Sequence, residues 1–294
     1  MGLRHKMAAG RWLGSALWLY CCAPVYAAQP QPDHQSPECV LRFALDTSFP
    51  PHIVLTPQQP EGLNVQMIRL LAAQVGCRVR FVNSPWARAL KLLQQGEIDV
   101  VSQLTYNQIR AKDIAFIGPH HQERMWLIAD PAKVPPLRQL ADLPQWPASM
   151  LIAVLNGGYF GPQLQQLRDD PVLQRRFYPM VSNQDKLALL ESGRVQAVLE
   201  EELAWFWRVK GQATVYQPLL LVHADPVYFG FSRVSVSPEL LRRLDAAWLQ
   251  LYQSGQLQQI RDYYLATPTA DLAPGAAAGS AAEISRMPAP APHL

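Results

Sequence analysis

A short run of small polar side chains, closed by an arginine, is well suited to binding chemistry. Ser102, Gln103, Thr105 and Asn107 stand within six residues of one another, and Arg110 ends the run. A guanidinium group binds a carboxylate through two parallel hydrogen bonds, and short polar side chains add further donors and acceptors. The run therefore predicts a carboxylate-binding site at the end of a strand.

Other residues that suit binding follow other predicted strands. They are Asp46, Phe49, Trp86, Gly157, Gly158, Tyr159 and Glu201. Asp46 and Glu201 can receive an ammonium group, while the rings of Phe49 and Trp86 offer flat apolar walls. Gly157 and Gly158 precede a predicted helix, where exposed backbone N–H groups attract anions. The set predicts a small-molecule site, although each member also has a purely structural explanation. Arg110 can pair with Asp113, the glycines can form only a turn, the glutamate can start a helix, and Trp86 can belong to the core.

The elements expected to position these residues alternate between strands and helices. Strands are predicted at 41–45, 79–82, 98–103, 150–155 and 195–199, with amphipathic helices at 64–75 and 86–95. Such alternation indicates an α/β fold whose parallel sheets are flanked by helices on both faces. In open sheets of this kind, ligands bind beyond the carboxyl ends of the strands. The candidate site residues all fall at such ends.

The chain also repeats itself, which predicts two lobes. The segments "LLQQGEIDVVSQ" (92–103) and "LLESGRVQAVLE" (189–200) share a helix end, a glycine and a following strand. Two α/β lobes of ordinary domain size account for this length of chain. We expect residues 38–127 to form the first part of lobe 1, residues 128–222 to form lobe 2, and residues 223–266 to return to lobe 1 with the C-terminal helices.

Both ends of the chain lie outside this predicted fold. Residues 1–27 combine basic residues with a short apolar stretch, as expected of a cleaved secretory signal; a retained membrane anchor is the alternative. Residues 267–294 are rich in Ala and Pro, which predicts a disordered tail. Removing Arg4, Lys6 and Arg11 with the signal leaves 23 basic and 23 acidic residues. This balance argues against nucleic acid as a partner.

Cysteine usage agrees with export. The predicted mature chain keeps Cys39 and Cys77, each two residues before a predicted strand. If those two strands pair in parallel, the sulfur atoms start side by side, and an oxidising compartment would let them form a disulfide. Two free buried thiols are the alternative.

Sequence signatures of catalysis are scarce. The chain holds no G-x-S-x-G, P-loop, H-E-x-x-H or C-x-x-C motif, and we expect no cofactor. His120, His121 and Glu123 could be taken for metal ligands, but adjacent histidines on an extended segment point to opposite faces. We therefore expect a surface loop there and no metal site.

These features together resemble a known family, the bacterial extracellular solute-binding proteins of family 3. The resemblance covers about residues 39–265 and depends on "DTSFPPH", "GLNVQMIRLLAAQVG", "SGQLQQIRDYYL" and, most specifically, "WARALKLLQQGEIDVVSQLTYNQIRAKDIAFIGP". It implies a two-lobed periplasmic binding protein fold of type II, joined by two crossover strands. It also implies a monomer in the periplasm that closes over a polar amino acid and delivers it to an inner-membrane ABC permease.

The resemblance also implies roles for individual residues. By position, Arg110 holds the ligand carboxylate with help from Thr105 and from N–H groups near Gly158, and Glu201 takes the ligand amino group. Phe49 and Trp86 enclose the ligand side chain, with Asp46 beside them. Gln103 and the longer acid Glu201 depart from the usual family pattern. Two alternative functions share the fold: a cyclohexadienyl dehydratase that acts on prephenate or arogenate through Glu201, and a soluble receptor that signals to a membrane kinase.

Overall fold

The computed structural model describes residue 2 and residues 38–265. The predicted signal (1–27) and the predicted tail (267–294) lie outside the described residues. Within the described part, no helix has the length and apolar character needed to cross a membrane.

The first part of the chain forms the predicted alternation of strands and helices. Its elements are β1 (Val40–Leu45), α1 (Leu63–Gln74), β2 (Arg78–Asn83), α2 (Trp86–Gln95) and β3 (Val100–Thr105). Strand β1 pairs in parallel with both β2 and β3. The predicted parallel arrangement is therefore confirmed for these strands.

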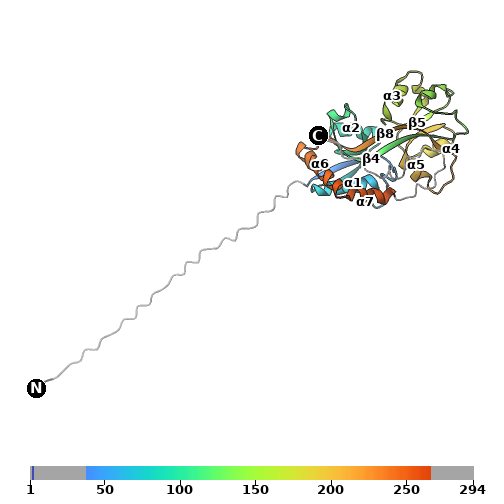
Figure 1. The fold of residues 1–294 in the computed structure, drawn as a ribbon. Helices are drawn as coiled ribbons and strands as arrows, with labels where there is room; N and C mark the ends of the chain where they lie inside the picture. Colours follow the sequence, from blue (N-terminus) through green and yellow to red (C-terminus); the bar gives the residue numbers. More distant parts are fainter. Residues whose placement is uncertain (1, 3–37, 266–294) are drawn as a thin grey trace. The chain divides into compact units, whose positions relative to one another are not determined.

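Two strands of 16 residues each, β4 (Ile114–Ala129) and β8 (Gln217–Ser232), run antiparallel to each other along nearly their whole length. They lie at the centre of an eight-stranded sheet with the order β2-β1-β3-β8-β4-β7-β5-β6. Figure 1 shows both long strands passing through the middle of the fold. They are the two crossover strands that the family resemblance implies.

The segment between the long strands builds the other half of the sheet. Its elements are β5 (Ile152–Leu155), α3 (Gly161–Asp169), β6 (Phe177–Met180), α4 (Lys186–Glu191), β7 (Ala197–Glu201) and α5 (Glu202–Val209). Three short 3-10 helices lie at Arg110–Lys112, Leu140–Gln145 and Gln174–Arg176. Strand β5 pairs in parallel with β6 and β7.

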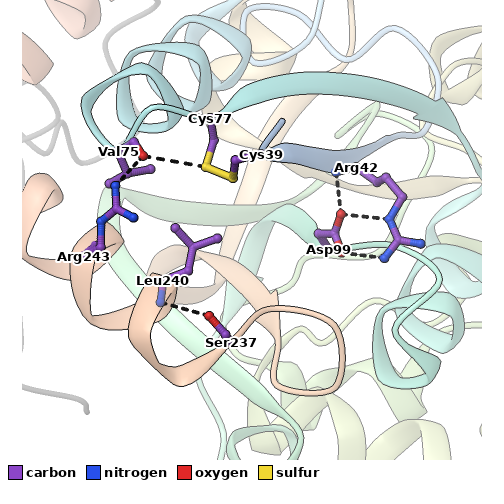
Figure 2. Close-up of a disulfide and its surroundings, with 8 residues drawn as sticks. All are labelled: Cys39, Arg42, Val75, Cys77, Asp99, Ser237, Leu240 and Arg243. Carbon is purple, nitrogen blue, oxygen red and sulfur yellow. Dashed lines mark hydrogen bonds and ion pairs between the residues drawn. A yellow bond between two sulfur atoms is a disulfide. The ribbon is translucent and has the colours of Figure 1, made fainter. Parts of the chain in front are cut away.

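After β8 the chain returns to the first lobe. Helices α6 (Pro238–Gln253) and α7 (Gln256–Leu265) pack against α1 and against each other (Figure 1). The Ser237 side chain caps α6 by accepting a hydrogen bond from the Leu240 N–H group, as Figure 2 shows. The C-terminal helices thus complete the core that β1 and α1 began.

Buried side chains divide into separate cores for the two lobes. The first lobe is built around residues such as Phe43, Leu71 and Trp248, and the second around residues such as Leu127 and Leu199. The predicted lobe boundaries, after residues 127 and 222, lie within β4 and β8. The exact division between lobes stays a prediction, since the crossover strands contribute to both cores.

The sequence repeat corresponds to a repeated structure. Helix α2 ends at Gly96 (φ 74°) before β3, and α4 is followed by Gly193 (φ 69°) before β7. A positive φ costs glycine little because it has no Cβ, so the residue suits a helix end followed by a turn into a strand.

The predicted disulfide is present between Cys39 and Cys77. Val40 and Arg78 are register partners in the parallel pair β1–β2, so the residues just before them face each other. Figure 2 shows the sulfur–sulfur bond at the start of these strands, near the Arg243 guanidinium that donates to the Val75 carbonyl. The strand register explains why the two cysteines meet.

Candidate functional site

A cavity lies between the two lobes, with an empty volume of about 850 Å³ including open solvent. Its polar lining is contributed by Asp46, Ser84, Ser102, Gln103, Thr105, Arg110, Glu123, Tyr159, Asn183, Lys186 and Glu200. Its apolar lining includes Phe49, Ile53, Trp86, Met125 and Phe160.

Most of the residues predicted from the sequence line this cavity. They are Asp46, Phe49, Trp86, Ser102, Gln103, Thr105, Arg110, Gly158 and Tyr159. Gly157 and Glu201 are not part of its lining. The structure thus brings together side chains from both lobes that are far apart in the sequence.

Arg110 lies at the start of a 3-10 helix and faces the cavity. One guanidinium nitrogen donates to the Thr105 carbonyl over 3.2 Å, and the Arg110 backbone N–H donates to the Asn107 side chain over 2.8 Å. Among the described residues no acid forms an ion pair with it, so the alternative of an Arg110–Asp113 pair is not observed. Burial lowers the pKa of Arg110, and Tyr159 and Glu123 oppose this effect. The remaining guanidinium N–H groups are available to an anionic ligand.

Strand β3 continues further than the sequence predicts. It runs to Thr105, and its register against β8 shifts between Val101 and Leu104, so Ser102 and Gln103 lie inside the strand. At this bulge Gln103 has a φ of 56°, and both polar atoms of its buried side-chain amide have no hydrogen-bond partner within the described part of the chain. The Ser102 hydroxyl accepts a hydrogen bond from the Asn64 amide over 3.2 Å. The predicted end at residue 103 is therefore wrong, because the bulge lets a strand present polar groups without ending.

The aromatic walls and the glycine loop meet across the cavity. The Trp86 indole N–H, from the first lobe, donates to the Gly157 carbonyl of the second lobe over 3.2 Å. The Gly158 N–H donates to the Leu155 carbonyl over 3.1 Å, and α3 starts only at Gly161. The Gly158 N–H is therefore engaged in a turn, and the expectation that it binds an anion does not match this arrangement.

Glu201 makes a second contact between the lobes instead of facing the cavity. One of its carboxylate oxygens lies 3.0 Å from His52 Nε2 and also accepts the Ala204 N–H at the start of α5, over 2.8 Å. Its other oxygen is buried without a partner among the described residues. The carboxylate is thus committed to a helix cap and to a histidine of the other lobe.

His120 and His121 are fully buried in β4, so the prediction of a surface loop is wrong. The ladder between β4 and β8 shifts register between Ile117 and His121, which interrupts the strict alternation of faces. Both rings therefore lie inside, with their Nδ1 atoms 2.8 Å apart, and the His121 ring stacks on His52 at 4.8 Å. Burial lowers the pKa of each ring well below its usual value, so both are neutral.

A chain of hydrogen bonds connects the bulge in β3 to the buried histidines. The Gln103 N–H donates to His120 Nε2 over 3.3 Å, and a hydrogen bond of 2.8 Å joins the Nδ1 atoms of His120 and His121.

His52, His121 and Glu201 offer ligand atoms that all lie within 4.8 Å of one another. A hydrogen bond joins His52 Nε2 to one Glu201 oxygen, and that oxygen also accepts the Ala204 N–H. His52 Nδ1, His121 Nε2 and the other Glu201 oxygen have no hydrogen-bond partner among the described residues.

Glu123 is a cavity residue that the sequence interpretation placed in a surface loop. Its side chain comes from the middle of β4, and the residue is only 7% exposed. Burial and the nearby carboxylate of Glu201 raise the pKa of Glu123 to about 8. The cavity therefore contains a buried acid that the sequence analysis did not select as a site residue.

Lys186 and Glu200 of the cavity lining form a buried ion pair that the sequence analysis did not predict. Lys186 Nζ lies 2.8 Å from one Glu200 oxygen, and Arg208 lies 3.3 Å from the other. Burial lowers the pKa of Lys186, and Glu200 opposes this effect. Burial also raises the pKa of Asp46 to about 6, which a hydrogen bond from the Thr47 N–H opposes. The only sequence signal for Lys186 and Glu200 as cavity residues was that a charged residue falls on the buried face of a predicted helix or strand.

Comparison with known families decides the classification. Residues 41–267 match the model of the bacterial extracellular solute-binding proteins, family 3. The chain belongs to this family. A search of curated proteins found no match.

Solved structures share the fold at low sequence identity. A histidine kinase sensor domain with similarity to periplasmic binding proteins is 22% identical (TM-score 0.65), with 78% of this chain and 96% of that chain covered. A putative L-cystine ABC transporter protein from Listeria monocytogenes is 16% identical (TM-score 0.66; 78% and 97% covered). An ancestral amino acid-binding protein, a precursor of cyclohexadienyl dehydratase, is 20% identical (TM-score 0.61; 76% and 94% covered). These similarities show the periplasmic binding protein fold for this member of the solute-binding family.

Proposed function

We propose that this solute-binding protein closes over a small ligand that carries a carboxylate, most specifically a polar amino acid. The observation that carries the proposal is the Arg110 guanidinium, which lines the cavity and has no acidic partner among the described residues. A desolvated cation without a counter-ion is stabilised by an anion that arrives with the ligand. A carboxylate fits the two-pronged geometry of the guanidinium.

The rest of the lining fits the remainder of an amino acid. The Ser102 hydroxyl can still donate its proton, and the unpartnered Gln103 amide can donate or accept. Phe49 and Trp86 supply apolar walls for a side chain, with Asp46 beside them. The hydrogen bonds between Trp86 and Gly157 and between His52 and Glu201 connect the two lobes beside the cavity.

The proposed cellular role is delivery of the amino acid from the periplasm to an inner-membrane ABC permease by a monomeric receptor. Its support is family membership together with a structural neighbour described as an ABC transporter protein. Cells that lack the protein should lose high-affinity uptake of the amino acid it binds. Unchanged uptake, with a lost transcriptional response instead, would favour the sensory alternative.

Ligand binding is tested with purified protein and a panel of the common L-amino acids and small carboxylates. A ligand that binds the folded state alone raises the apparent stability by about 2.7 kcal/mol at a concentration of 100 times its Kd. We expect at least one amino acid to raise the melting temperature and to bind in calorimetry. Failure of every amino acid and carboxylate to bind would contradict the proposal.

One observation favours a second candidate, a dehydratase. Glu123 is a buried acid in the cavity whose pKa is raised to about 8, so it could protonate a leaving group at neutral pH. Prephenate and arogenate are the substrates to try, with absorbance readout of phenylpyruvate or phenylalanine formation. We expect no turnover. A rate well above background that disappears in Glu123→Gln would replace the receptor assignment with an enzymatic one.

A further inference from the structure

Three buried side chains bring potential metal ligands together from distant parts of the chain. His52 lies between β1 and α1, His121 lies in β4, and Glu201 is the last residue of β7. Each offers one ligand atom, and these three atoms lie within 4.8 Å of one another. All three residues are at most 1% exposed. The sequence grouped His121 with its immediate neighbours, whereas the folded chain places it beside a histidine and an acid from other elements.

Each of the three residues also has an atom whose hydrogen-bonding capacity is unused. His52 Nδ1, His121 Nε2 and one Glu201 oxygen are buried and have no hydrogen-bond partner among the described residues. Most buried polar atoms in native proteins are paired, and an unpaired one calls for an explanation such as a bound ion. A divalent cation would also supply the positive charge that a buried carboxylate requires.

We propose that His52, His121 and Glu201 bind a divalent transition-metal ion, of which zinc is the representative. Two imidazoles and one carboxylate form a donor set that zinc uses in proteins. Magnesium and calcium prefer oxygen donors, so a cluster with two histidines selects against them. The ligand class is therefore set by the chemistry of the three side chains.

The distances require only a small adjustment. His52 Nε2 lies 3.0 Å from a Glu201 oxygen, and two ligands of one tetrahedral zinc ion lie about 3.4 Å apart. The ion takes the place of the proton between these two atoms, and that proton passes to solvent. His121 completes the site when its ligand atom moves inward by about 1 Å, given ligand bonds of about 2.0–2.2 Å.

His120 is placed to orient the His121 ring. A metal-bound histidine usually donates a hydrogen bond from its other ring nitrogen. With Nε2 on the ion, His121 carries its proton on Nδ1, which lies 2.8 Å from His120 Nδ1. His120 then carries its own proton on Nε2 and gives up the hydrogen bond from the Gln103 N–H. At 3.3 Å that bond is a long one, so its loss costs little.

The proposed metal site is separate from the ligand cavity. His52, His121 and Glu201 do not belong to the cavity lining. Because His52 comes from the first lobe and Glu201 from the second, a bound ion ties the lobes together and favours the arrangement in which they touch. The inference goes beyond the proposed function and does not depend on it, since metal binding needs no amino acid.

The experiment measures zinc binding by the purified full-length exported protein, prepared without a polyhistidine tag and stripped of metal with a chelator. We expect calorimetry to show saturable binding of zinc in the absence of any amino acid. Zinc should also raise the melting temperature, because it binds the folded state in preference to the unfolded chain.

Substitutions at the three residues identify the site. His52→Ala and His121→Ala should each weaken zinc binding by more than about 100-fold, because loss of an outer partner of a metal ligand alone costs about 10- to 100-fold. Glu201→Gln should weaken binding similarly, while its amide oxygen can still accept the Ala204 N–H at the start of α5. The stabilisation by zinc should disappear in all three variants.

His223→Ala is the matched control. His223 Nε2 lies 2.8 Å from an Asp225 oxygen, so it is also a histidine beside a carboxylate, but it does not belong to the three-ligand cluster. Its replacement should leave zinc affinity and the stabilisation by zinc unchanged.

X-ray absorption spectroscopy of the zinc-loaded wild type tests the site even if the variants do not fold. We expect the spectrum to show two imidazole ligands on the ion. A wild type that binds no zinc, a zinc ion without imidazole ligands, or full zinc affinity in both His52→Ala and His121→Ala would overturn the proposal. None of these results would affect the proposed function, which is tested by amino-acid binding.

Discussion

Replacing Arg110 by alanine should abolish ligand binding while preserving the fold. The guanidinium makes one hydrogen bond within the described protein, to the Thr105 carbonyl, and the backbone hydrogen bond to Asn107 survives the substitution. A hydrogen bond from a charged group is worth about 1.5–3 kcal/mol. The relief of a desolvated cation offsets part of this loss. The melting temperature should therefore fall by no more than about 8 °C.

The effect on binding should be much larger. Truncating one partner of a desolvated charge pair costs about 2–5 kcal/mol, which is a loss of about 30- to several-thousand-fold in affinity. Arg110→Lys should recover only part of the affinity, since an ammonium ion cannot form the two parallel hydrogen bonds of a guanidinium. Calorimetry with the amino acid found by screening measures all three proteins.

Arg243→Ala provides a matched control for this experiment. Arg243 lies on α6 and donates to a single carbonyl, that of Val75, over 2.6 Å. Neither Arg243 nor Val75 lines the cavity, so the loss of Arg243 should change affinity little. Wild-type affinity in Arg110→Ala would show that Arg110 has only a structural role, and the reasoning about the carboxylate site would be refuted.

Two further predictions concern stability. The Cys39–Cys77 bond closes a loop with a sequence separation of 38. Replacing both cysteines by alanine should therefore lower the free energy of unfolding, measured by guanidinium denaturation, by about 2–4 kcal/mol. Thiol titration of the denatured, unreduced wild type should find no free thiol in these two residues, and detection of two thiols would contradict the bond. The second prediction concerns pH. His120 and His121 have lowered pKa values, so below about pH 6.5 the unfolded state binds more protons at these residues than the folded state does. Their contribution to the free energy of unfolding therefore decreases as pH falls. Glu123 has a raised pKa, so its contribution acts in the opposite direction and is lost as pH rises towards 8. Between pH 5.5 and 7.5 the free energy of unfolding of the unliganded wild type should therefore change little, whereas that of Glu123→Gln should increase by about 2–3 kcal/mol as pH rises. An unchanged free energy of unfolding for Glu123→Gln over this range would show that the buried histidines do not stay neutral.

The sequence by itself determined the main elements of the fold. The alternation of apolar runs with amphipathic helices, and the repeated Leu-Leu-x-x-Gly before a strand, are local patterns that the chain expresses without reference to distant residues. The positions of Cys39 and Cys77 before two strands were enough to predict their disulfide once parallel pairing was assumed. Arg110 was selected from a local pattern too, an arginine after a run of small polar residues at the end of a core strand, and the structure places it in the cavity lining.

Tertiary structure alone decided what the acids and histidines do. Burial and pairing depend on residues that are far apart in the chain: Glu201 meets His52 of the other lobe, and Glu200 meets Lys186 and Arg208. The fate of Glu123, His120 and His121 depended on a register shift between two 16-residue strands, which no local pattern encodes. Three residues of β4 separate Ile117 from His121, whereas a single residue of β8 separates their partners Phe229 and Val227, so the alternation of faces cannot be continued through this segment from the sequence alone. For this reason the sequence could indicate Arg110, which the structure places in the cavity lining, whereas the burial and pairing of the acids and histidines required the packed structure.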